Sequence, residues 1–225
     1  MNERLKKTFL RIARLFAGLF LYAVGIVLTI NANLGLGPWD VFHQGLSQTL
    51  GITMGQASIA MGLIIVAVNY FMGEKIGWGT LCNMLFIGIF MDFLMLNKLI
   101  PVFDSVLLQV GMMLAGMFII GIASFLYIGA GLGSGPRDGL MVMLTKLTKK
   151  SVRFVRNGIE ITVLIAGYFL GGFVGVGTIL IALSIGYFVQ LAFKLFKFDI
   201  KKVTHRYVED DIKFIKDYFV QAAEK

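Results

Sequence analysis

One segment of this chain occurs twice, and this repeat limits the fold more than any other feature. Residues 34–40 read LGLGPWD, and residues 132–138 read LGSGPRD, 98 positions later. Aligning 34–93 with 132–191 without a gap gives 16 identities in 60 positions, many of them glycine or proline. These two residue types decide where a backbone turns and where segments approach closely, so their repetition marks a duplicated chain path. The sequence therefore predicts one folding unit used twice.

The composition is that of a membrane protein. Of the 225 residues, 57% are apolar and 15% are charged, and the mean hydropathy is +0.81. A helix that crosses the hydrocarbon layer of about 30 Å needs roughly 20 apolar residues. Six runs approach that length: 10–33, 55–72, 79–97, 106–130, 157–173 and 178–197. We therefore expect an all-α membrane protein with six transmembrane helices.

Two short segments between these runs, 38–51 and 136–149, each open with a proline in the first helical turn. Each reaches about 21 Å as a helix, which is too short to cross comfortably. Thr53 and Ser151 are expected to cap the next helix of each copy, and Gln56 completes a capping box after Thr53. Each copy then has three spanning helices, and an odd number turns the second copy upside down. The sequence predicts two inverted three-helix repeats.

This arrangement divides the chain into four parts. They are a first repeat (1–97), an external linker (98–105), a second repeat (106–198) and a cytoplasmic amphipathic tail (199–225). With both termini in the cytoplasm, where basic residues collect, only Lys98 of the 21 Lys and Arg residues lies outside. A topology in which the short segments cross leaves only Lys75 and Arg137 outside. Segment length rather than charge therefore decides between the two.

The tail changes character from about Tyr207. Apolar residues recur there at helical spacing among charged ones: Val208, Ile212, Ile215, Phe219 and Ala222. We expect a helix that lies on the inner membrane surface, with a dimer contact or docking site as the alternative.

Several classes of function find no support in the sequence. The formal charge of +8 belongs to residues that flank apolar runs, without the aromatic-basic pattern of nucleic-acid binding. The lone Cys82 and the distant His43 and His205 form no cluster at ligand spacing, so we expect no metal and no cofactor. The Gly-x-Gly-Thr starts at Gly77 and Gly175 lack the lysine of a phosphate loop and are expected to permit close helix packing. No nucleophile-base pair is present, so we do not expect an enzyme.

The repeated Gly-x-Gly-Pro-x-Asp motif supplies the candidate site. Its backbone residues are Gly35, Gly37 and Pro38, and again Gly133, Gly135 and Pro136. Asp40 and Asp138 fall near the third position of each short helix, where a carboxylate satisfies free N–H groups. They are either ordinary helix-start carboxylates or, because broken helices build many transport sites, gates or ligand contacts. In the second case Asp40 serves the outer entrance and Asp138 the inner one. Trp39 and Arg137 share one repeat position, so the two entrances are expected to differ.

Two acidic residues in apolar runs complete the candidates, because a carboxylate inside a bilayer is costly and often functional. Glu160 follows Arg156 by four residues, so an ion pair within one helix is its alternative role. Asp92 lies six residues before Lys98, and its repeat mate is the neutral Gln190. Its role stays open between an interfacial pair and a part of the path.

The segments Gly-Leu-Gly-Pro-Trp-Asp at 35–40 and Gly-Leu-Gly-Ser-Gly-Pro-Arg-Asp-Gly-Leu at 131–140 resemble the bacterial YczE/YyaS/YitT family, its YczE-type members most closely. The likeness covers about 10–197, nearly the whole apolar part. The resemblance implies a multi-pass protein of the bacterial cytoplasmic membrane and supplies no substrate.

The leading hypothesis is a small-solute transporter or permease, because an internal pseudo-two-fold axis supplies two alternative states around one path. The alternative is a membrane-embedded accessory or regulatory protein that presents the basic stretch at 146–156 and the tail to a partner. The expected partners are the lipid bilayer, a small polar solute and, in a homo-oligomer, further copies of the chain, but no nucleic acid.

Overall fold

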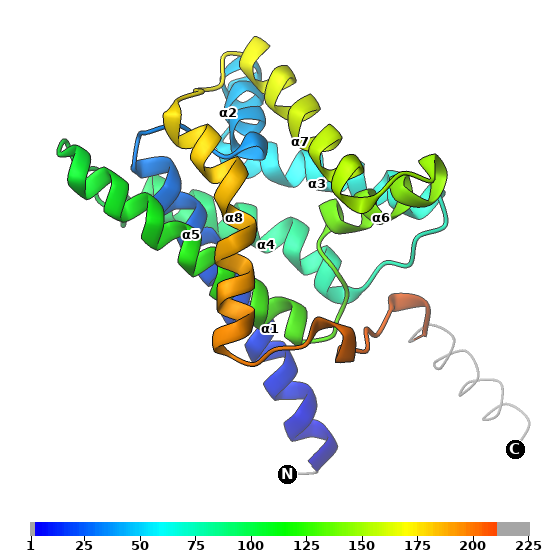
Figure 1. Ribbon diagram of the computed structural model, residues 1–225. Coiled ribbons are helices and arrows are strands. Elements are labelled where there is room, and N and C mark those ends of the chain that lie inside the picture. Colours follow the sequence, from blue (N-terminus) through cyan, green and yellow to red (C-terminus); the bar gives the residue numbers. More distant parts are fainter. Residues whose placement is uncertain (1–2, 211–225) are drawn as a thin grey trace, which may run out of the picture.

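The computed structural model describes residues 3–210. Eight helices follow one another there, with a 3-10 turn η1 (Ile200–Lys202) after the last (Figure 1): α1 (Glu3–Asn31), α2 (Pro38–Leu50), α3 (Met54–Phe71), α4 (Trp78–Leu96), α5 (Val106–Gly129), α6 (Pro136–Thr148), α7 (Val152–Phe169) and α8 (Val176–Leu195). The helices α6, α7 and α8 begin 98 residues after α2, α3 and α4, and α5 ends 98 residues after α1. The spacing of the sequence repeat is thus also a spacing of helix boundaries.

Among the described residues, five helices are long and apolar enough to cross a membrane: Lys6–Asn31 within α1, and α3, α4, α5 and α8. Large apolar side chains such as Leu63, Leu107 and Leu183 are exposed on them. Since lipid rather than water suits such surfaces, the prediction of an all-helical protein in contact with the bilayer is confirmed. The helix α7 has the 18 residues of α3 but carries three charged residues, so the sixth span stays a prediction.

Local sequence signals fix the helix starts. The Thr53 hydroxyl accepts a hydrogen bond from the Gln56 N–H, and the Gln56 side chain accepts one from the Thr53 N–H. The Ser151 hydroxyl likewise accepts from the Phe154 N–H. Both predicted caps are therefore present. The Ser151 cap also explains why α7 begins before the apolar run predicted at 157–173, because charged residues of the first turns are inside the helix.

The packing of the helices interleaves the two halves of the chain. The central pair is α1 and α5, where a Cβ built on Gly116 would lie 2.8 Å from the carbonyl oxygen of Gly25. On this pair, α4 packs against α1 and α8 against α5. The short helices each pack on the opposite half, α2 on α7 and α6 on α3 (Figure 1). One interface has no extensive counterpart: α3 packs along α4, whereas α7 makes almost no contact with α8.

Candidate functional site

The turns that precede α2 and α6 depend on glycine. Gly35 and Gly133 have φ angles of +123° and +118°, which residues with a side chain rarely adopt. Pro38 and Pro136 then occupy the first helical turn, where a missing N–H costs nothing. The two motifs therefore turn the chain in the same way and begin the two short helices.

Each motif loop is held by a helix from the other half of the chain. The N–H of Gly177, at the start of α8, donates to the carbonyl of Leu34 at 2.7 Å. The N–H of Gly79, at the start of α4, donates to the carbonyl of Leu132 at 2.6 Å. The glycine two positions before each donor also approaches that carbonyl too closely for any side chain. The small residues at these starts thus permit a close approach, which joins each helix start to a motif loop rather than to another helix.

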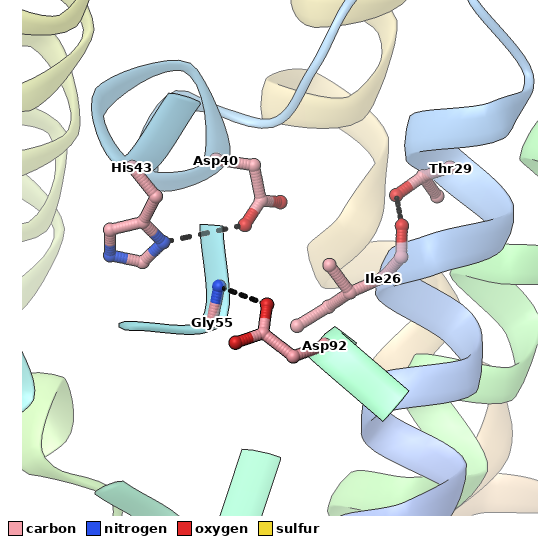
Figure 2. Close-up of polar contacts among 6 residues, drawn as sticks. All are labelled: Ile26, Thr29, Asp40, His43, Gly55 and Asp92. Carbon is pink, nitrogen blue, oxygen red and sulfur yellow. Dashed lines mark hydrogen bonds and ion pairs between the residues drawn. The ribbon is translucent and has the colours of Figure 1, made fainter. Parts of the chain in front are cut away.

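The two motif aspartates both meet a ring-bearing side chain. The Tyr127 hydroxyl, from α5, donates to Asp138 Oδ2 at 3.3 Å. Asp40 Oδ1 lies 3.8 Å from Nδ1 of His43, one turn later on α2 (Figure 2). His43 is almost fully buried, and its Nδ1 has no hydrogen-bond partner. Asp40 therefore faces a buried imidazole across a gap wider than a hydrogen bond.

Trp39 and Arg137 contact each other directly. The guanidinium carbon of Arg137 lies 4.4 Å from the centre of a Trp39 ring, which is a cation–π contact. These residues occupy the same position in the two motifs. The short helices α2 and α6 therefore begin at one common place in the molecule.

Two cavities share this place. The larger has a volume of about 170 Å³ and the smaller about 100 Å³. Both are lined by Tyr22, Ile26, Trp39, Arg137 and Asp138. The larger is also lined by Asp40 and by residues of α7 and α8, and the smaller by His43 and by residues of α3 and α4. The structure thus brings both motif aspartates to the wall of the larger cavity, rather than to two separate entrances.

The α7 pair suggested by the sequence is present at the same cavity. Arg156 Nε donates to Glu160 Oε1 at 3.0 Å. Both side chains line the larger cavity, which is therefore surrounded by three carboxylates and two guanidinium groups. Such a mixed polar wall suits a small hydrophilic ligand. Within residues 3–210, no three His, Cys, Asp or Glu side chains are grouped as metal ligands would be.

Asp92 lies elsewhere and has a different set of partners. Its carboxylate accepts a hydrogen bond from the Thr53 hydroxyl. It accepts another, at 2.9 Å, from the N–H of Gly55, which Figure 2 shows. Thr53 is the N-cap of α3, and Gly55 belongs to its first turn, whose N–H groups have no partner within the helix. Asp92 does not line either of these cavities. It attaches α4 to the start of α3, and the pair with Lys98 suggested by its spacing plays no part in that contact.

Sequence reasoning missed three side chains of the site. The sequence suggests His43 only as a candidate metal ligand. Its position three residues after Asp40, however, puts both side chains on one face of α2. Tyr22 and Tyr127 lie inside long apolar runs, and only the phenol hydroxyl of each side chain suggests a polar role. Their rings pack edge to face, with centres 6.0 Å apart; Tyr22 lines both cavities and Tyr127 lines the smaller one.

A third hollow has a volume of about 360 Å³ and so exceeds both of the cavities described above, which keep the names larger and smaller. It lies next to the smaller cavity, and Gly135 lines both. Lys146 Nζ lies 2.6 Å from Glu74 Oε1 at its wall. Residues 203–208, here called the C-terminal segment, cover this region. His205 Nδ1 accepts from the N–H of Gly133 at 3.2 Å, and Lys75 Nζ lies 5.6 Å from the Tyr207 ring. Most of the predicted amphipathic helix falls at 211–225, outside the described residues.

Taken together, these features define a multi-pass helical membrane protein with cavities between its helices whose walls combine apolar and charged side chains. The chain belongs to the DUF6198 family, a family of unknown function whose profile matches residues 9–194. It is 40% identical to an uncharacterized membrane protein, YczE, of Bacillus subtilis over 181 residues, which cover 79% of this chain and 82% of the relative. The family expected from the motif is thereby confirmed.

Two further relatives are similar over most of their length. An uncharacterized protein of Haemophilus influenzae is 33% identical over 80% of this chain and 81% of its own. The uncharacterized protein YyaS of Bacillus subtilis is 28% identical over 72% of this chain and 82% of its own. No solved structure matches the chain.

Proposed function

We propose that this protein is a small-solute permease whose path passes through the larger cavity. The observation that carries the proposal is that Asp40 and Asp138 line that one cavity, together with the stacked Trp39 and Arg137. A transporter binds its solute where discontinuous helices end near the middle of the membrane. Here two short helices begin at the cavity and supply N–H groups, carboxylates and a guanidinium group to a hydrophilic solute. The protein binds and moves this solute without chemical change.

In this proposal the path runs between two inverted repeats, 1–97 and 106–198, joined by an external linker at 98–105. The equal spacing of helix starts supports the duplication. The hydrogen bonds between the repeats support a two-fold relation. The start of α8 donates to the motif loop of the first repeat, and the start of α4 donates to the motif loop of the second. In such an arrangement α7 is the sixth span. Its charged residues are tolerated in the membrane because two of them face the cavity.

The inverted topology has a direct test. With Cys82 replaced by Ala, a single cysteine is placed at Lys75 or at Lys98, both of which are exposed. A membrane-impermeant thiol reagent should label Lys75→Cys only from the cytoplasmic side and Lys98→Cys only from the outside. If the short helices crossed the membrane, Lys75→Cys would be labelled from outside, and the inverted arrangement would be abandoned.

Transport itself is tested in proteoliposomes. The purified protein is incubated with a defined mixture of amino acids, sugars, nucleosides, carboxylates and polyamines, and the internal contents are measured by mass spectrometry. At least one solute should accumulate with the natural chain. Asp40→Asn and Asp138→Asn should each reduce its uptake while the protein still inserts and runs as a single species. Uptake that is normal in both variants would defeat the proposed role of the aspartates.

The second candidate is an accessory or regulatory protein. The observation in its favour is that the C-terminal segment is bound to the loops around Gly131 and Ile76, through N–H donors of Arg206 and Val208. A tail anchored in this way presents a fixed surface next to basic residues such as Lys146. Deleting residues 203–225 discriminates the two functions. A permease should keep its uptake, whereas an adaptor should lose a partner protein recovered by cross-linking in the native membrane.

A further inference from the structure

The two halves differ most between α7 and α8. In the first half, α3 and α4 are in tight contact: a Cβ built on Gly88 would lie 2.5 Å from the carbonyl oxygen of Gly55, and one on Gly62 would lie 2.6 Å from Met84 Cγ. At Gly186, the repeat equivalent of Gly88 on α8, a Cβ would meet nothing within 4 Å. In Figure 1, α7 and α8 diverge from the loop that joins them. The second half thus has open space where the first half has an interface, and the larger cavity, which residues of both α7 and α8 line, lies in this space, here called the cleft.

The residues of α7 explain this difference. Along one face of the helix, small residues of α3 are replaced by charged residues at the equivalent positions of α7: Gly55 by Arg153, Ser58 by Arg156 and Gly62 by Glu160. Their spacing of three and four residues puts them on one side of the helix. Small residues let membrane helices approach closely, whereas a row of charged side chains prevents it.

Two of these three charges face the cleft. Arg156 and Glu160 line the larger cavity on one side, and Ile181, Ala182 and Ile185 of α8 line it on the other. The two charged groups form an ion pair, yet the Arg156 side chain remains 54% exposed. Because an ionised group in contact with hydrocarbon is costly, the space beside these side chains has to hold water rather than lipid chains.

We infer that the cleft between α7 and α8 is a water-filled entrance through which hydrophilic solutes reach the larger cavity, and that the charged face of α7 keeps it open. The basic residues at its end, Lys149, Lys150 and Arg153, are exposed and raise the local concentration of anions at the entrance itself. The inference deepens the proposed function and rests on it for the path. Its test needs no transported solute, so the two can fail separately.

The test is thiol labelling in vesicles, with Cys82 replaced by Ala. Gly186→Cys lies one turn after Ala182 of the cavity wall and has open space beside it, and Leu183→Cys, on the exposed face of the same helix, is the matched control. Membrane-impermeant methanethiosulfonates should modify Gly186→Cys and leave Leu183→Cys unmodified. An anionic reagent should react at Gly186→Cys about tenfold faster than a cationic one, each relative to its rate with a free thiol. An unreactive Gly186→Cys means that lipid or protein fills the cleft and overturns the inference, and faster reaction of the cationic reagent overturns the charge preference.

A second variant tests the cause of the opening. Replacing Arg153, Arg156 and Glu160 by Gly, Ser and Gly gives α7 the face of α3. If the charges keep the helices apart, this triple variant should fold, close α7 onto α8 and protect Gly186→Cys at least tenfold from the reagent. Undiminished labelling of a variant that runs as a single species would show that the charges do not hold the cleft open. If the triple variant aggregates, Glu160→Gly alone is used, with a partial decrease in labelling expected and undiminished labelling again counting against the inference.

Discussion

The guanidinium group of Arg137 lies 4.4 Å from a ring of Trp39, although the two residues are 98 positions apart in the chain. Both follow the proline of their motif. Residues related by a two-fold axis can touch only near that axis, so in the proposed arrangement this contact marks the centre of the protein. The pair is also the most asymmetric element of the motif, with an aromatic ring in one copy and a cation in the other.

The environment of Trp39 is the first prediction. Trp78 is the only other tryptophan, so Trp78→Phe leaves Trp39 as a single fluorescent reporter. Arg137→Ala in this background should shift its emission to longer wavelength, because water replaces the cation over the ring. It should also lower stability by about 0.5–2 kcal/mol. Arg153→Ala is the control and should leave the emission unchanged; an unchanged spectrum with Arg137→Ala would exclude the contact.

The two equivalent glycines of α4 and α8 provide the second prediction. Gly88→Ala brings a methyl group against the backbone of Gly55 and should destabilise the protein by about 1–3 kcal/mol. Gly186→Ala adds the same atom in open space and should be neutral or stabilising by up to about 1 kcal/mol, since alanine favours helix. Thermal unfolding in detergent, followed by size-exclusion chromatography, measures both. Equal effects would contradict the described difference between the two helix pairs.

Asp92 gives the third prediction. Asp92→Ala removes the acceptor for two donors at the start of α3 and should cost about 1.5–3 kcal/mol in stability. The protein that still folds should keep its uptake, because the side chain does not line the cavities described above. Gln190→Ala, at the equivalent position of α8, should change stability by less than about 0.5 kcal/mol. A variant of normal stability but lost uptake would instead place Asp92 on the path.

The fourth prediction concerns pH. Partial burial lowers the pKa of His205 below its ordinary value of 6.5, and the neutral ring accepts a hydrogen bond from Gly133. A lowered pKa means that the folded form binds the proton less well. The attachment of the C-terminal segment is therefore strongest above pH 6.5 and weakens as the pH falls below that value.

Hydrogen exchange of the N–H groups of Arg206 and Val208 measures this attachment, after correction for the intrinsic effect of pH. Protection should fall between about pH 7 and 5 in the natural chain. His205→Gln keeps an acceptor but cannot titrate, so its protection should not change with pH. Protection that falls equally in both proteins would assign the effect to another group.

The sequence predicts the fold as far as its signals are local. Proline in a first turn, the Thr53 and Ser151 caps and the length of apolar runs place the helices within a few residues. The repeat predicts equal helix starts in both halves. The pairing of Trp39 with Arg137 and of Asp92 with α3 depends on segments that are far apart in the chain. The spacing of apolar residues predicts helices and cannot predict which distant side chains meet. The sequence contains the three charged residues of α7 that accompany the gap between α7 and α8. Their significance emerges only from the structure, where the small residues at the equivalent positions of α3 pack tightly against α4.

The hydrogen bond from Gly177 to Leu34 also bears on how the chain is made. Leu34 leaves the ribosome early, whereas its donor follows only after seven helices have been synthesised. Until α8 is made, the carbonyl of Leu34 lacks this donor. The first motif loop therefore reaches its final contacts only late in synthesis, although it is among the first parts of the chain to be made.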